Sequence, residues 1–299
     1  MKFLGTGAAE SLPNPMCDCA VCTAVRAAGH HDYKKRSCFF VNDSTIIDFG
    51  TDVVAAAHEY ELNLCGLQHI LFTHSHDDHF SFANLSLLGM SSRVWQEPIH
   101  LYLSPQAFAW LAQNLSAMNP DFAVELLDAQ TGYIRFGNGN AYLVHSVPCG
   151  EWFSVGELRV MAVKSTHQGW GKDELAWNYL LVFPNGKTLL YACDTGRYDA
   201  AALNAVKDRR LDALIMECTF GSRRMEKGCG HLDAYAFVDM LEQFLQQNTI
   251  TTDTQVFSTH LNHKHTFSPR QLQAFFDENA PLPVQVAFDG QEFFLEERK

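Results

Sequence analysis

The 299-residue chain lacks several features that would place it in other protein classes. No run approaches the ~18 consecutive apolar residues that a membrane-spanning helix needs, although 47% of the residues are hydrophobic. Basic side chains are few: 22 Lys and Arg stand against 34 Asp and Glu, for a formal net charge of −12. Broad nucleic-acid or anionic-membrane surfaces are usually basic. These absences predict a globular protein with no membrane partner and no nucleic-acid partner larger than nucleotides.

We expect no secretory leader, because the N-terminal Met-Lys-Phe-Leu-Gly-Thr-Gly reaches glycine too early for the apolar core of a signal peptide. We therefore expect a cytoplasmic location. The nine cysteines are an odd number, and a reducing compartment disfavours a disulfide framework, so metal ligation or burial should account for them. Two basic clusters, residues 34–36 and Arg223-Arg224 with Lys227, are expected mainly as solvated loops.

The pattern of apolar residues predicts strands that alternate with helices, as in layered α/β proteins. The expected strands are residues 1–4, 37–42, 44–48, 67–73, 99–104, 157–163, 178–183, 188–193, 213–217 and 255–259. The expected helices are residues 52–59, 82–91, 105–115, 200–207, 233–247 and 269–278. Residues with metal-ligand chemistry follow the strands at their carboxyl ends, where loops converge on functional sites: Asp48, His74, His167, Asp194 and His260.

The segment His74-Ser-His-Asp-Asp-His79 concentrates three histidines and two aspartates behind an expected strand. In extended chain His74 and His76 share a face and could bind one metal ion, whereas in a helix they would point in opposite directions. Asp78 and His79 come where the chain must turn, so they can face a second position nearby. This spacing suits two metal ions better than one.

The later His167, Asp194 and His260 complete a motif of the form H-x-H-x-D-H…H…D-T-G…H. This order resembles the metallo-β-lactamase superfamily over essentially the whole chain. The resemblance implies a single domain over residues 1–299, an αβ/βα four-layer sandwich of two mixed sheets with outer helices. The implied ligands are His74, His76 and His167 for one divalent ion, Asp78, His79 and His260 for a second, and Asp194 as the bridge. His145 in "YLVHSVP" competes with His167, and Asp48 is expected to orient a ligand.

The stretch "PMCDCAVC" holds Cys17, Cys19 and Cys22, three of the four ligands of a tetrahedral zinc site. His263 could be the fourth, with His265 as the alternative. Together with "GTG" at 5–7, "THLNH" at 259–263 and "FDG" at 288–290, the cysteines resemble the PhnP-type phosphodiesterase subset of the superfamily. That resemblance implies a structural zinc that ties the loop of residues 13–36 to the strand end carrying His260.

The resemblance implies a hydrolase, and we expect a metal-dependent phosphodiesterase. Two divalent ions, Zn²⁺ or Mn²⁺ with Ni²⁺ or Fe²⁺ as alternatives, would direct a bridging hydroxide at a small phosphodiester, cyclic ones included. His231 in "CGHLDAY" is expected to protonate the leaving oxygen and contact the phosphate. The predicted catalytic residues are Asp78, Asp194 and His231. The predicted phosphate contacts are Lys172, Arg223 and Arg224, while Trp170 or Trp177 could stack on a base or sugar.

Three other functions stay open at this stage. The same fold supports hydrolysis of thioesters, lactams or lactones. Processing of tRNA 3′ ends is a second alternative, against which the acidic charge counts. A non-catalytic accessory role, as in PqqB-like relatives that lost ligands, is the third. A homodimer is also left open, and the loops 168–177 and 219–230 and the segment 105–140 look enlarged with no assigned role.

Overall fold

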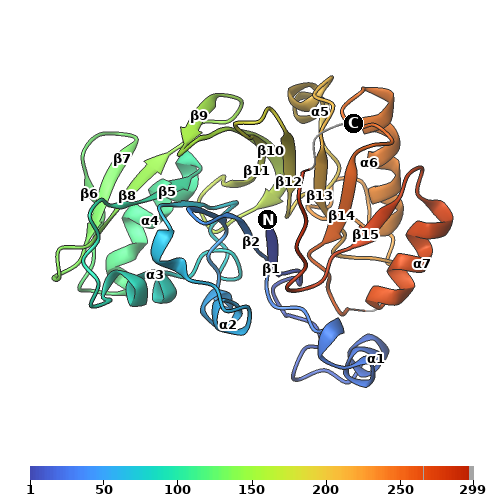
Figure 1. The fold of residues 1–299 in the computed structure, drawn as a ribbon, viewed down its shortest axis with the longest axis horizontal. Coiled ribbons are helices and arrows are strands. Elements are labelled where there is room, and N and C mark those ends of the chain that lie inside the picture. Colours follow the sequence, from blue (N-terminus) through green and yellow to red (C-terminus); the bar gives the residue numbers. More distant parts are fainter. Residues whose placement is uncertain (265, 296–299) are drawn as a thin grey trace.

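In the computed structural model, which describes residues 1–264 and 266–295, two mixed β-sheets pack together with helices outside them (Figure 1). The first sheet has the strand order β1-β2-β3-β4-β5-β8-β7-β6. Its strands are β1 (Lys2–Gly5), β2 (Cys38–Asn42), β3 (Thr45–Ile47), β4 (His69–Leu71), β5 (Ile99–Leu103), β6 (Glu125–Leu126), β7 (Thr131–Arg135) and β8 (Ala141–Ser146). The four strands β3, β4, β5 and β8 run parallel, and the others pair antiparallel.

The second sheet has the order β15-β14-β13-β12-β11-β10-β9. Its strands are β9 (Trp152–Val155), β10 (Leu158–Gln168), β11 (Leu175–Val182), β12 (Thr188–Ala192), β13 (Ala213–Glu217), β14 (Gln255–Thr259) and β15 (Val284–Val286). The strands β12 to β15 are parallel, while β11 is antiparallel to both β12 and β10. The strand β10 therefore runs in the same direction as β12, and its carboxyl end lies at the same edge of the sheet.

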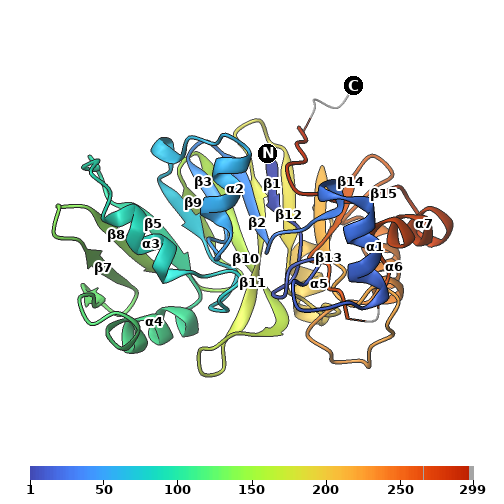
Figure 2. The same ribbon diagram turned by 90° about the horizontal axis from the view of Figure 1, so that it is seen from below.

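Helices cover both outer faces of the sandwich. They are α1 (Ala20–Ala28), α2 (Val53–Glu59), α3 (Phe82–Gly89), α4 (Pro105–Met118), α5 (Ala200–Val206), α6 (Ala234–Gln246) and α7 (Pro269–Asn279), with short 3₁₀ turns at His30–Asp32 and Leu64–Gly66. Figures 1 and 2 show α2, α3 and α4 with the first sheet and α5, α6 and α7 with the second, while α1 projects from the body. Side chains cap several helix starts, for example Ser104 at α4 and Asp233 at α6.

Three apolar clusters correspond to the three interfaces of a four-layer sandwich. One lies between the first sheet and α2 to α4, around residues such as Phe72 and Leu111. A second joins the inner faces of the two sheets, where Phe39 of β2 stacks on Tyr191 of β12. The third packs the second sheet against α5 to α7. The predicted αβ/βα architecture is therefore confirmed. No helix in the described part of the chain is long and apolar enough to cross a bilayer.

The strands that the sequence did not predict lie mainly in the enlarged middle of the chain: β6 to β9 occupy residues 125–155, and β15 lies near the C-terminus. The helix α1 was also unpredicted, because its cysteines were interpreted as a metal-binding loop. The loop after His167 is shorter than expected: β10 extends through Gln168 and β11 begins at Leu175, which leaves residues 169–174 as the connection.

Candidate metal centre

Three polar residues leave parallel strands in a left-handed backbone conformation at one edge of the sandwich. Asp48 after β3, Asp194 after β12 and His260 after β14 have φ angles of 64°, 51° and 60°. Residues other than glycine rarely adopt this conformation, and such strain clusters at functional sites. This conformation directs the chain sharply away from the sheet, so each of the three side chains faces the loops instead of the core.

The first ligand group consists of His74, His76 and His167, whose ring nitrogens lie within 4.8 Å of one another. His76 Nδ1 lies 3.2 Å from His167 Nε2. A tight turn begins at His76, whose backbone carbonyl accepts the N–H groups of His79 and Phe80, so the chain turns at Asp78 and His79 as the sequence predicted. The His74 and His76 rings meet, with centroids 4.5 Å apart.

The second group consists of Asp78, His79 and His260, again within 4.8 Å. Asp194 lies between the two groups. Its Oδ2 is 2.7 Å from His79 Nε2 and 3.3 Å from His260 Nε2, while its Oδ1 is 4.0 Å from His167 Nε2. The structure therefore brings together all seven residues that the sequence assigned to a dinuclear centre, with Asp194 between the two groups.

The buried imidazole nitrogens of this cluster are suited to bind metal ions. The Nε2 atoms of His74, His79 and His260 are buried; that of His74 has no hydrogen-bonding partner among the described residues, and those of His79 and His260 face the carboxylates of Asp78 and Asp194 in the same cluster. Burial lowers the pKa of His74 well below its usual value and that of His167 to about 4, so both imidazoles are held neutral, as metal ligation requires. A buried polar atom without a partner is costly, and a divalent cation would satisfy all three nitrogens.

Asp48 contacts the His79 ring at Nδ1, the nitrogen that faces away from the centre. Its Oδ2 lies 2.6 Å from His79 Nδ1, and Thr73 Oγ1 donates to the same carboxylate. Burial opposes protonation of His79, but the carboxylates of Asp78, Asp194 and Asp48 outweigh it and raise the pKa of His79 well above its usual value. A carboxylate on the far nitrogen fixes the ring so that Nε2 faces the centre. This is the orienting position that the sequence analysis expected for Asp48.

Glu217, which was not predicted from the sequence, is a buried carboxylate that contacts His231 directly and His260 through Thr219. It ends β13 with no exposed surface, and its Oε1 lies 2.7 Å from His231 Nδ1 and accepts the backbone N–H of Thr195. Its Oε2 accepts from Thr219, whose hydroxyl lies 2.8 Å from His260 Nδ1. Burial would lower the pKa of His231, but Glu217 raises it to about 9. A signal was available: a glutamate closes the otherwise apolar strand "ALIME".

His231 is partly exposed beside both groups, with Nδ1 3.5 Å from Asp194 Oδ1. Asp233, two residues on, caps α6 and also accepts the Met225 backbone N–H, which fastens the preceding loop. Because Glu217 occupies Nδ1, Nε2 of His231 is the nitrogen left for a proton directed at a bound molecule.

The basic residues predicted to contact phosphate have different neighbours in the structure. Arg223 covers the Phe220 ring at 5.9 Å, and Phe220 in turn contacts His231 with ring centroids 5.6 Å apart. Arg224 is directed elsewhere, onto Tyr235 at the start of α6. Lys172 is exposed in the 169–174 connection. Of the three, Arg223 is the one that packs on a neighbour of His231.

His145 and Trp177, two alternatives from the sequence, belong to other surroundings. His145 lies on β8, where its Nε2 is 2.9 Å from His100 Nδ1 and its ring stacks on His100. Trp177 is 7% exposed, and its indole N–H donates to the Val147 carbonyl. Neither His145 nor Trp177 is part of the ligand groups found among the described residues.

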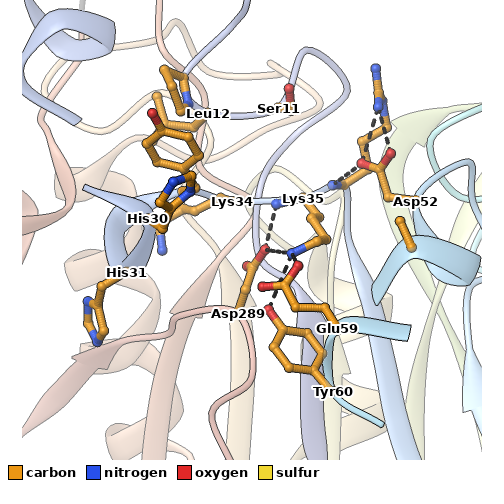
Figure 3. A pocket seen from close by; sticks show the side chains of 14 residues that line it. Ser11, Leu12, His30, His31, Lys34, Lys35, Asp52, Glu59, Tyr60 and Asp289 are labelled. Carbon is orange, nitrogen blue, oxygen red and sulfur yellow. Dashed lines mark hydrogen bonds and ion pairs between the residues drawn. The ribbon is translucent and has the colours of Figure 1, made fainter. Parts of the chain in front are cut away.

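The basic cluster at residues 34–36 is not a solvated loop, so that expectation was wrong. Lys34 is 2% exposed and donates to the Ala287 carbonyl, while Lys35 is 2.6 Å from Glu59 and its backbone N–H donates to Asp289. These contacts border a pocket of about 520 Å³ (Figure 3). The cluster therefore joins the N-terminal and C-terminal segments, because buried charges need partners.

A separate group of potential ligands lies beside α1. Cys17, Cys19, Cys22 and His263 offer three sulfurs and a ring nitrogen within 4.8 Å of one another, and His263 Nε2 is buried and has no hydrogen-bonding partner among the described residues. Burial favours the neutral Cys19 thiol, but hydrogen bonds from the Cys22 backbone and His263 lower its pKa to about 6, whereas burial raises that of Cys22 to about 12. One tetrahedral cation would let all three thiols ionise. His265 lies outside the described residues.

Replacement of Cys22 by alanine is expected to remove one zinc equivalent per chain and to lower the Tm on the order of 10 °C, because loss of a structural metal is among the largest single-site effects. Metal analysis and thermal unfolding measure the two effects. Cys65→Ala is the matched control, since Cys65 is exposed in the turn Leu64–Gly66. Equal zinc contents in the Cys22 and Cys65 variants would contradict the site.

Relatives of known sequence and structure place the chain in a family. A model described as a beta-lactamase superfamily domain matches residues 45–260, and the chain belongs to that superfamily. Ribonuclease Z of Myxococcus xanthus (strain DK1622) is 26% identical, with 97% of this chain and 95% of the relative covered. A diphosphatase from the PhnP family has a TM-score of 0.69 at 17% identity, with 97% and 94% of the two chains covered. Zn(2+)-bound PqqB from Methylobacterium extorquens has a TM-score of 0.67 at 15% identity, with 97% and 98% covered.

These similarities and the ligand groups define a metal-dependent hydrolase with the metallo-β-lactamase fold. The superfamily and the fold class predicted from the sequence are thereby confirmed.

Proposed function

We propose that the protein is a phosphodiesterase that hydrolyses small phosphodiesters, cyclic ones included, at a dinuclear centre. The observation that carries this proposal is the His231–Glu217 pair, which sets an oriented proton donor beside the Asp194 bridge. A phosphodiester needs such a donor, because an alkoxide leaving group must be protonated as it departs. The names of two relatives, a ribonuclease and a diphosphatase, both denote hydrolysis at phosphorus.

In this proposal His74, His76 and His167 would hold one divalent ion, and Asp78, His79 and His260 would hold the other, with Asp194 available to both. Two bound divalent ions supply an activated water and neutralise charge on the phosphoryl group. Asp48 and Thr219 keep the His79 and His260 rings in place through their Nδ1 atoms. His231 gives its proton to the leaving oxygen, and Arg223 contributes positive charge at the rim.

The proposal is tested by metal analysis combined with a substrate panel. The panel contains bis(p-nitrophenyl) phosphate, nucleoside 2′,3′-cyclic phosphates and cyclic sugar phosphates, beside a thioester, a lactone, a β-lactam and a tRNA precursor. We expect two metal equivalents in addition to the zinc at Cys17, Cys19, Cys22 and His263, and turnover of the phosphodiesters at least 100-fold above that of the carbonyl substrates.

The other outcomes separate the alternatives. Cleavage of the tRNA precursor in preference to small diesters would favour 3′-end processing, to which the ribonuclease Z similarity gives weight. The net charge of −12 opposes that function, because RNA binding gains affinity from phosphate neutralisation by basic residues. Hydrolysis of the thioester or lactone alone would overturn the phosphodiesterase proposal. A preparation whose only metal is the cysteine-bound zinc would indicate an accessory protein.

A further inference from the structure

Trp170 is a large aromatic side chain that stands exposed at the rim of the metal centre. Its side chain is 58% exposed, and its ring centroid lies 4.5 Å from that of His76 at an interplanar angle of 63°. His76, His167 and His231 are the partly exposed histidines of the centre, whereas His74 is buried. A bound molecule therefore reaches the centre on the side where Trp170 lies.

The position of Trp170 is enforced by a buried carboxylate. Glu174 is 1% exposed, and its Oε1 accepts the backbone N–H of Ser75, the residue between His74 and His76. Its Oε2 accepts from the Ser75 hydroxyl at 2.5 Å and from the Gly171 backbone N–H at 2.6 Å. The Trp170 backbone N–H completes the arrangement by donating to Ser75 Oγ. One carboxylate thus fastens the 169–174 connection to the metal-binding turn.

The glycines on either side of Trp170 leave room for this carboxylate. A Cβ at Gly169 would lie 2.3 Å from Glu174 Cδ, and a Cβ at Gly171 would lie 2.8 Å from the Gln106 carbonyl oxygen. The backbone therefore wraps closely around Glu174, and the indole is the part of the connection that reaches outward. An exposed tryptophan held this firmly needs an explanation other than packing.

We propose that Trp170 is a stacking platform for the nucleobase of the substrate, so that nucleotides are the preferred phosphodiesters. The proposal rests on the proposed phosphodiesterase function. A flat π surface next to a phosphoryl-binding centre suits a base attached to the reacting phosphate. A bare sugar would need hydrogen-bonding partners, but the polar groups of Glu174, Ser75 and Gly171 are satisfied among themselves.

The test compares two substrates with the same reacting diester: adenosine 2′,3′-cyclic phosphate and methyl ribofuranoside 2′,3′-cyclic phosphate, which lacks a base. With the metal-loaded enzyme, Trp170→Ala is expected to lower the ratio of their kcat/KM values about 10- to 100-fold, mainly through the KM of the adenosine substrate. Trp170→Phe should retain most of the ratio. Trp152→Ala is the control, because Trp152 lies on β9 under Arg159 and Arg209. An equal fall for both substrates in Trp170→Ala would overturn the proposal.

A binding measurement keeps the platform testable if no phosphodiester is turned over. Adenosine 5′-monophosphate should quench the tryptophan fluorescence of the wild-type holoenzyme, and ribose 5-phosphate should not. The quenching is expected to disappear in Trp170→Phe and to persist in Trp152→Phe. Quenching that persists in Trp170→Phe would overturn the platform, whereas failure of every phosphodiester in the substrate panel would overturn only the proposed function.

Discussion

Replacement of Asp194 by asparagine is expected to lower phosphodiester hydrolysis at least ~10⁴-fold and to reduce the metal content of the dinuclear centre. Asp194 is 2% exposed, and its two oxygens face the two ligand groups. Asparagine keeps the shape but removes the negative charge that would hold two cations close together. A loss of this size corresponds to about 5.5 kcal/mol of transition-state stabilisation, within the range attributed to metal-ion catalysis.

The matched control is Asp199→Asn, which also exchanges a carboxylate for an amide five residues away. Asp199 caps α5, and its side chain is about half exposed; asparagine caps a helix equally well, so this variant loses only an exposed charge that lies 3.9 Å from Lys164. Metal analysis and steady-state kinetics on both variants give the comparison, with thermal unfolding to show that each is folded. Full metal content and wild-type turnover in Asp194→Asn would exclude a bridging role.

Replacement of His231 by alanine is expected to lower kcat about 10²- to 10⁴-fold while both metal ions are retained. His231 lies outside the seven-residue ligand set and is held by Glu217 instead, so its loss removes a proton donor and leaves the ligands in place. The defect should depend on the leaving group. It should be small for bis(p-nitrophenyl) phosphate, whose nitrophenolate departs without a proton, and large for a diester with an alkoxide leaving group.

Glu217→Gln gives the second half of this test, because it keeps the bulk of the side chain but removes the charge that raises the pKa of His231. We expect the same leaving-group dependence with a smaller fall in rate. His58→Ala, in an exposed position of α2, is the control histidine. A defect of equal size for both leaving groups would assign His231 to phosphate binding instead of proton transfer.

The sequence was most informative where function overrides packing. The cluster at residues 74–79, Asp194 and His260 could be identified because each comes directly after an apolar strand, and polar side chains that leave a buried strand are unfavourable without a functional role. Element boundaries followed the apolar periodicity closely for β13 and β14, which match residues 213–217 and 255–259 as predicted. Strong local signals of this kind need no tertiary context.

Residues whose role depends on tertiary contacts were harder to predict. Glu174 lies in a short connection, and nothing in "GKDEL" indicates that it contacts Ser75, 99 positions away. The same holds for Lys34, which looks like part of a basic surface but is buried against Ala287. The strands β8 and β9 were missed for a related reason, because each pairs with a strand outside the enlarged segment 105–140: β8 with β5 and β9 with β10.

The left-handed conformations of Asp48, Asp194 and His260 imply a trade-off between the stability of the fold and catalysis. Each costs on the order of 1 kcal/mol relative to glycine at the same position, so the three residues together lower the free energy of unfolding. Glycine at any of the three would relax the chain and remove a group on which turnover depends. Selection for thermal stability alone would therefore be expected to replace these three residues, on which the proposed activity depends.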